Sequence, residues 1–241
     1  MDLQTSVAED SMWSEIREGI VDCLPTVFGY LSIGFTCGLI SKSCGLDFWQ
    51  AVGMSAFIYG GASQFIAAGM IHAAASPLSI IFTVFLVNFR HLFMSAAMTP
   101  YFRDNSFRQN FLVGILLTDE SFALASTRGL RDGQLSYPWM MGLNICAYLN
   151  WVLATALGFA FGGWIPDYEA WGLDFALASM FAGLLVSAAR ALPSARKSIV
   201  IVAMAILLFF LSSQFLTIHA AVLVAAIGGA LAGREVTVWK I

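Results

Sequence analysis

Long uninterrupted apolar runs constrain the fold of this chain more than any other feature. A hydrocarbon core of about 30 Å is crossed by about 20 helical residues, so each run is read as a candidate membrane helix. The runs are continuous, whereas the strands of a membrane barrel alternate in polarity. The sequence therefore predicts an all-α polytopic membrane protein. The runs lie at about 20–41, 49–71, 78–99, 110–127, 138–165, 173–190, 197–213 and 215–233.

Composition supports a membrane protein and argues against a soluble domain. Hydrophobic residues make up 59% of the chain and charged residues 11%, against roughly 45–50% apolar residues in soluble domains. The formal net charge of −3 gives no reason to expect a nucleic-acid partner. The cysteines lack the spacing of a metal site or a disulfide framework, so we expect no metal and no cofactor. They are Cys23, Cys37, Cys44 and Cys146.

The charged loops suggest how the runs cross the membrane. If 110–127 crossed, the basic residues before it and after it would lie on opposite sides, which the positive-inside rule disfavours. We therefore predict seven crossings, with 110–127 a re-entrant or broken segment. The N-terminus is then outside, and the C-terminus is cytoplasmic with Lys42 and the arginines at 103, 108, 128 and 131. Eight crossings with the N-terminus inside are the alternative.

The domain organisation follows from the same reading. Residues 1–18 are a polar, acidic segment, expected outside together with the acidic loop 166–174. Residues 19–241 form a single transmembrane domain. Its halves, about 20–100 and 138–213, share the tetrapeptide GLDF at 45–48 and 172–175. With three crossings between them, the halves would be an inverted repeat, an architecture of secondary transporters. A chance match between apolar segments is the alternative.

Polar residues interrupt the run "PLSIIFTVFLVNFRHLFMSAAMTP" near its middle. Asn88, Arg90 and His91 fall there, and ionisable groups at that depth are costly and usually face a cavity. Arg90 needs a counter-charge, and Asp119 and Glu120 are the candidates. Alternatively, Arg90 extends to the membrane surface.

The acidic pair lies in "TDES", residues 118–121. Two adjacent carboxylates in a low-dielectric pocket do not both stay ionised easily, which suits a proton carrier or an amine-binding group. The alternatives are that Asp119 and Glu120 only neutralise Arg90 or lie at a solvated loop tip.

A glycine pair interrupts another run in "YGGASQF", residues 59–65. Gly60 and Gly61 can unwind the helix and free backbone groups for a ligand. They can equally allow close helix packing. Gln64 favours a site, because a glutamine within a membrane helix needs a partner.

Five motifs, in this order, resemble the AzlC family: "LPTVFGYLSIGF", "YGGASQF", "VNFRHLFMSA", "LLTDESFAL" and "GLDFAL". The resemblance covers about residues 25–191. It implies the large subunit of an exporter of leucine, isoleucine, valine and related amino acids, with methionine a further candidate. It also implies a bacterial or archaeal inner membrane, a proton gradient as the driving force, and a small AzlD-type membrane subunit as partner.

Together, the resemblance and the chemistry assign roles by position. Arg90 and the glycine break can meet a substrate carboxylate, and the acids can meet its amine. We predict substrate binding by Gly60, Gly61, Ser63, Gln64, Asn88 and Arg90, and proton coupling by Asp119, Glu120 and His91. We do not expect an enzyme: Ser63 lacks the glycine context of a rhomboid-type nucleophile and no HExxH motif is present. An intramembrane enzyme and a non-transporting scaffold subunit are the alternatives.

Overall fold

A computed structural model of the chain describes residues 3–164 and 195–216, with scattered positions within 170–186 and 221–233. The chain forms two compact units, Met1–Phe181 and Ala182–Ile241, which are described separately. All elements among the described residues are helices, in agreement with the predicted fold class. The expected loop 166–174 and the expected spans 173–190 and 215–233 lie largely outside the described residues.

Three helical segments in the described residues are long and apolar enough to cross a membrane. The first is Ser11–Ser43, within α1 (Leu3–Ser43). The second is Pro77–Phe102, made of α4 (Pro77–Asn88), α5 (Arg90–Met98) and η1 (Thr99–Phe102). The third is Tyr137–Trp164, made of α8 (Tyr137–Phe161) and η2 (Gly162–Trp164). This confirms a polytopic membrane protein.

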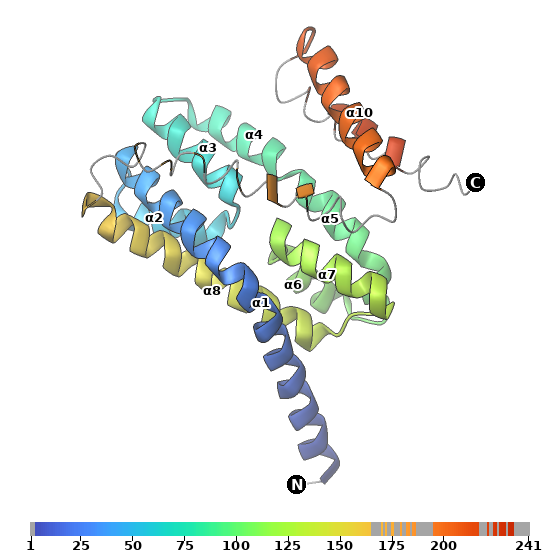
Figure 1. Cartoon of the computed structure of the whole chain (residues 1–241). Helices are drawn as coiled ribbons and strands as arrows, with labels where there is room; N and C mark the ends of the chain where they lie inside the picture. Colours follow the sequence, from blue (N-terminus) through green and yellow to red (C-terminus); the bar gives the residue numbers. More distant parts are fainter. Residues whose placement is uncertain are drawn as a thin grey trace. The chain divides into compact units, whose positions relative to one another are not determined.

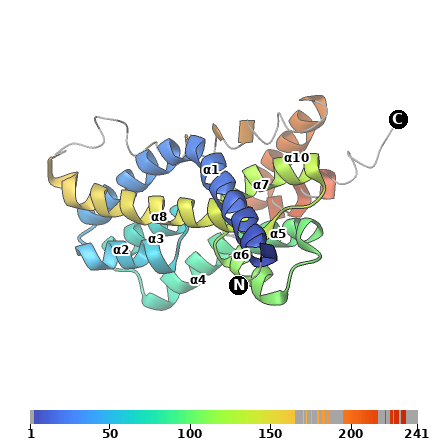
Figure 2. The same cartoon turned by 90° about the horizontal axis from the view of Figure 1, so that it is seen from below.

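Helices α1 and α8 lie side by side and run in the same direction (Figures 1 and 2). Glycines on both helices make this contact possible. A Cβ atom at Gly19 would overlap the carbonyl oxygen of Trp139, and one at Gly38 would overlap that of Thr155. The two helices therefore share two ends, called here the Trp139 end and the Lys42 end, the latter marked by a 3.2 Å hydrogen bond from Lys42 Nζ to Phe159 O.

Helices α2 (Phe48–Phe57) and α3 (Gly61–His72) form a first re-entrant hairpin. Helices of 10 and 12 residues are about 15–18 Å long, roughly half of the hydrocarbon core. His72 Nδ1 lies 3.3 Å from Cys44 O, so the hairpin begins and ends at the Lys42 end. The predicted crossing at 49–71 is wrong, because the chain turns back at the glycine pair.

Helices α6 (Phe107–Ile115) and α7 (Asp119–Asp132) form a second hairpin, which begins and ends at the Trp139 end. Gln134 Nε2 donates a 2.9 Å hydrogen bond to Asp104 Oδ2, joining the residues just before and just after the hairpin. The predicted break in 110–127 is present, since α6 ends at Ile115 and α7 begins at Asp119; re-entry into the membrane stays a prediction. Among residues 3–164, three helical segments are thus long and apolar enough to cross a membrane, and two pairs of short helices turn back.

The two hairpins enter from opposite ends, and each begins with the same capping box. Asp47 and Gln50 form it before the first hairpin, and Ser106 and Gln109 before the second. The hydropathy of the runs does not reveal this similarity between the hairpins, because the capping residues are polar. The inverted repeat predicted from GLDF pairs α1 with α8 and requires them to run in opposite directions. The two helices run in the same direction, so the prediction is wrong for this pair. The rest of its second copy lies largely outside the described residues.

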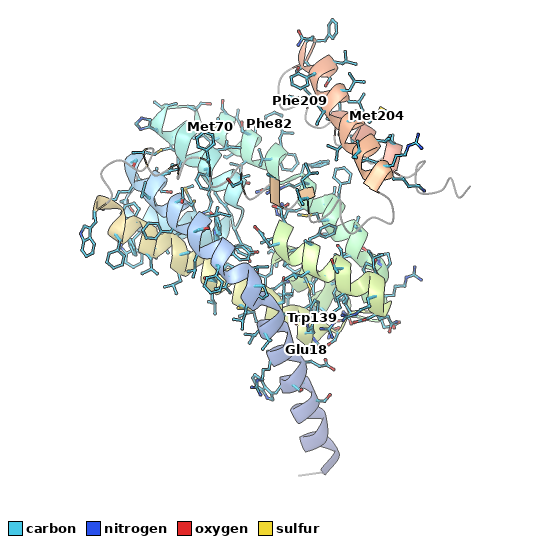
Figure 3. The ribbon with its side chains drawn as sticks, in the orientation of Figure 1. Glu18, Met70, Phe82, Trp139, Met204 and Phe209 are labelled. Carbon is cyan, nitrogen blue, oxygen red and sulfur yellow. The ribbon has the colours of Figure 1, made fainter. Side chains whose placement is uncertain are left out.

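The acidic N-terminal segment lies at the Trp139 end with basic residues of α7. Arg128 Nη1 donates hydrogen bonds of 2.9 Å to Glu18 and 3.0 Å to Asp22, and Asp22 also accepts from Trp139 Nε1 at 2.9 Å. Figure 3 shows Glu18 and Trp139 close together. The prediction that the acidic segment and Arg128 lie on opposite sides of the membrane is wrong. So is the placement of Lys42 on the same side as Arg128.

The second unit contains α10 (Ala195–Ser213), which matches the predicted run 197–213. Its described neighbours pack closely on it. A Cβ atom at Gly229 would lie 3.2 Å from the Cβ of Ala205, so small residues bring the two segments together.

Candidate functional site

The tips of both hairpins meet halfway along α1 and α8, where they enclose a small cavity. Its walls come from five parts of the chain: α1, the first hairpin, α5, the second hairpin and α8. The α4–α5 segment is interrupted here, since the single residue Phe89 separates the two helices. The lining residues are Tyr30, Tyr59, Gly60, Gly61, Arg90, His91, Thr118, Asp119, Glu120 and Trp151.

The predicted ion pair is present. Arg90 Nη2 lies 2.9 Å from Asp119 Oδ2, and the two side chains are 28% and 19% exposed. Arg90 therefore does not extend to the membrane surface. The pair links a spanning helix to the tip of the second hairpin.

Glu120 has different partners from Asp119. Tyr30 OH donates a 3.0 Å hydrogen bond to Glu120 Oε2 and shares a 2.5 Å hydrogen bond with Thr118 Oγ1. Thr118 also caps α7. The two adjacent acids thus occupy different environments, one beside a guanidinium and the other beside a phenol.

A second group of polar contacts joins the first hairpin to α4. Ser63 Oγ donates to Asn88 Oδ1, and His91 Nδ1 lies 3.1 Å from Asn88 O. A Cβ atom at Gly60 would lie 3.2 Å from Asn88 Oδ1. The glycine pair interrupts the helix and also lets neighbours approach closely, while ligand binding by Gly60 and Gly61 stays a prediction.

Gln64 lies behind the cavity, not in its wall. Its Oε1 accepts a 2.6 Å hydrogen bond from Trp151 Nε1, and its Nε2 donates a 2.8 Å hydrogen bond to Ser55 Oγ. Trp151 in turn covers Gly61, where a Cβ atom would lie 3.1 Å from the indole ring. In this conformation Gln64 holds Trp151 in place, and its amide group does not line the cavity.

The cavity is small in this conformation. Its volume of about 20 Å³ holds about one water molecule. An amino acid fits only if the hairpin tips move apart. A larger apolar cavity of about 540 Å³ lies between α5 and α6 and includes Leu117, the neighbour of Thr118. Within the described part of the chain, no group of three or more His, Cys, Asp or Glu side chains could hold a metal ion.

The model of the AzlC protein family matches residues 25–165, which include both hairpins and the cavity. The chain belongs to the AzlC family. No solved structure matches the chain.

Relatives of known sequence are membrane proteins of bacteria and archaea. The branched-chain amino acid transport protein AzlC of Bacillus subtilis is 27% identical over 170 residues, which cover 70% of this chain and 66% of that protein. The inner membrane protein YgaZ of Escherichia coli is 30% identical over 175 residues, 70% of this chain and 71% of that protein. A membrane protein of Archaeoglobus fulgidus is 30% identical over 172 residues, which cover 70% of this chain and 74% of that protein. The chain thus spans about two thirds of the length of the relatives it matches.

Sequence reasoning found six of the ten cavity residues and missed four. Thr118 lies in the TDES motif but was given no role. The other three, Tyr30, Tyr59 and Trp151, are aromatic residues in apolar runs, a pattern that usually indicates core packing. Tyr59 carried a signal in the sequence, because it directly precedes the glycine pair. Tyr30 and Trp151 carried none, since only the packing of α1 against α8 brings them to the hairpin tips.

Proposed function

We propose that this protein is a subunit of a secondary transporter that exports branched-chain and related hydrophobic amino acids. The observation that carries the proposal is the meeting of two re-entrant tips around Arg90, Asp119 and Glu120 at half depth. Charged residues at such a depth mark substrate and ion pathways. Broken helices at the midplane are a transporter feature. The printed name of the Bacillus subtilis relative supports the substrate class.

The cavity offers groups for both charges of an amino acid. The N-terminus of α3 at Gly60–Gly61 and the guanidinium of Arg90 can meet a carboxylate. Asp119 and Glu120 can meet an ammonium group. The apolar cavity beside Leu117 can take an aliphatic side chain once the second hairpin moves.

The hairpins suggest how access alternates. The first hairpin separates the cavity from the Lys42 end, and the second separates it from the Trp139 end. Opening one hairpin at a time would expose the site to one side at a time. Proton uptake by the Asp119–Glu120 pair would weaken the Arg90 ion pair and release the second hairpin, and His91, in the cavity wall, can share the proton.

The positions of the charges revise the proposed orientation. Arg103 and Arg108 lie before or within the second hairpin, and Arg128 and Arg131 near its end, so all four belong to the Trp139 end. The Lys42 end has Lys42 as the basic residue of its loop. By the positive-inside rule, we propose that the Trp139 end, and with it the N-terminal segment, is cytoplasmic. A cytoplasmic C-terminus and a small AzlD-type partner stay predictions.

Transport by purified protein tests the proposal. Vesicles loaded with labelled leucine are prepared with this protein alone and with a co-expressed small subunit. We expect leucine efflux that responds to a pH gradient when both subunits are present. Absence of efflux and of leucine binding in both preparations would favour a scaffold. Proteolysis or hydrolysis products without efflux would favour an intramembrane enzyme.

A further inference from the structure

Tyr59 lines the cavity with a buried hydroxyl group that is not hydrogen-bonded within the described part of the chain. Its side chain is 7% exposed, and its OH has no hydrogen-bond partner among the described residues. Buried hydroxyl groups are nearly always hydrogen-bonded, so an exception needs an explanation. A ligand in the cavity provides one.

The backbone of Tyr59 is held in an unusual conformation. Its φ of +45° is left-handed, which a bulky side chain adopts rarely. Two contacts of Tyr148 hold it there: the rings pack edge to face with centroids 4.9 Å apart, and Tyr148 OH donates a 3.1 Å hydrogen bond to Ala56 O. The strain places the Tyr59 ring in the cavity wall, beside Gly60.

The N-terminus of α3 faces the same cavity. This helix has 12 residues, and its N-cap, Gly60, supplies no side-chain hydrogen bond. The hydroxyl of Ser63, which could have capped the helix, binds Asn88 instead. Free amides at a helix N-terminus attract anions. The first hairpin therefore presents the N-terminus of α3 and the Tyr59 hydroxyl at its tip, without a carboxylate, whereas the second presents two carboxylates.

We propose that the Tyr59 hydroxyl and the first amides of α3 together bind the α-carboxylate of the substrate. The ammonium group then points to Asp119 and Glu120 on the second hairpin, and Arg90 stays on Asp119. Each hairpin thus binds one charge of the zwitterion. This inference rests on the proposed function, because it assigns the two ends of that substrate.

The test compares leucine with leucinamide, in which a neutral amide replaces the carboxylate. Both are measured as competitors of labelled leucine uptake into vesicles that contain this protein and its small subunit. The wild-type protein should prefer leucine. In Tyr59→Phe, the affinity for leucine should fall about tenfold, as expected for one hydrogen bond to a charged group, with little change for leucinamide. Tyr101→Phe is the control, because it removes a tyrosine hydroxyl on η1, outside the cavity wall. Its ratio of leucine affinity to leucinamide affinity should equal that of the wild type.

Equal losses for both competitors, or no loss, in Tyr59→Phe would overturn the inference. If Tyr59→Phe does not fold, the wild-type protein still decides: equal affinity for leucine and leucinamide excludes a carboxylate subsite. A wild-type protein that transports no amino acid would instead refute the proposed function, which separates the two failures.

Discussion

Arg90 on α5 and Asp119 at the start of α7 lie 2.9 Å apart, so a spanning helix and the tip of the second hairpin are joined by opposite charges inside the membrane. Breaking the ion pair on one side leaves a charge without compensation in a region of low dielectric. Removing both charges avoids this cost. We therefore expect the ion pair to hold the second hairpin closed over the site. The coupling free energy between Arg90 and Asp119 can be measured.

Asp119→Asn should lower both the thermal stability and the transport rate, because Arg90 loses its counter-charge. Adding Arg90→Gln should restore part of the stability, although not transport. A double-mutant cycle on the unfolding free energy should show a coupling of about 1–3 kcal/mol. The control pair is Arg131 and Asp132, an exposed contact of 2.7 Å, which should couple much more weakly. Additive effects at Arg90 and Asp119 would contradict a functional ion pair.

Glu120→Gln should reduce the dependence of leucine efflux on pH. The substitution keeps the shape of the side chain and a hydrogen-bonding oxygen for Tyr30 but removes the titratable group. Efflux is measured from loaded vesicles over a range of external pH. Glu15→Gln, on the N-terminal segment where Glu15 accepts from Ser136, serves as the control and should keep the wild-type profile. An unaltered profile in Glu120→Gln would remove this residue from proton coupling.

Gly158→Ala should destabilise the protein by about 1–3 kcal/mol, the usual range for overpacking. A Cβ atom there would overlap the carbonyl oxygen of Phe35, so α1 and α8 would have to separate. The measurement is the melting temperature in detergent. Gly69→Ala is the control, because a Cβ atom at that helical position meets nothing within 4 Å. It should leave the melting temperature unchanged or raise it. Equal effects at both positions would argue against the close contact of α1 and α8.

Cysteine labelling tests the two hairpins and the orientation. In a background without native cysteines, Asn105→Cys and Gln134→Cys flank the second hairpin and should react from the same side as Ser14→Cys. Ala73→Cys, which follows the first hairpin, should react from the opposite side. With a membrane-impermeant reagent on intact cells, Ala73→Cys alone should be labelled. Labelling of positions 105 and 134 from different sides would show that the second hairpin crosses.

The chemistry of the site was largely readable from the sequence, because charge within an apolar run is conspicuous whatever the fold. A carboxylate partner for Arg90, Asp119 or Glu120, could be named in advance, since a buried guanidinium requires one, and the structure shows that it is Asp119. Gln64 could not be placed in the same way. Its need for partners was clear, but only the structure shows that Trp151 and Ser55 meet that need.

The sequence by itself determined the membrane environment, the helical class and the depth of the charged residues, because these depend on hydropathy and the length of each run. Only the tertiary structure decided which runs cross and which return. A run of two short helices is as hydrophobic as one long helix, so 49–71 reads as a span until His72 is found beside Cys44. The structure also decided which aromatic residues face the cavity. That depends on the glycine contacts that set α1 against α8, and these join residues more than a hundred positions apart.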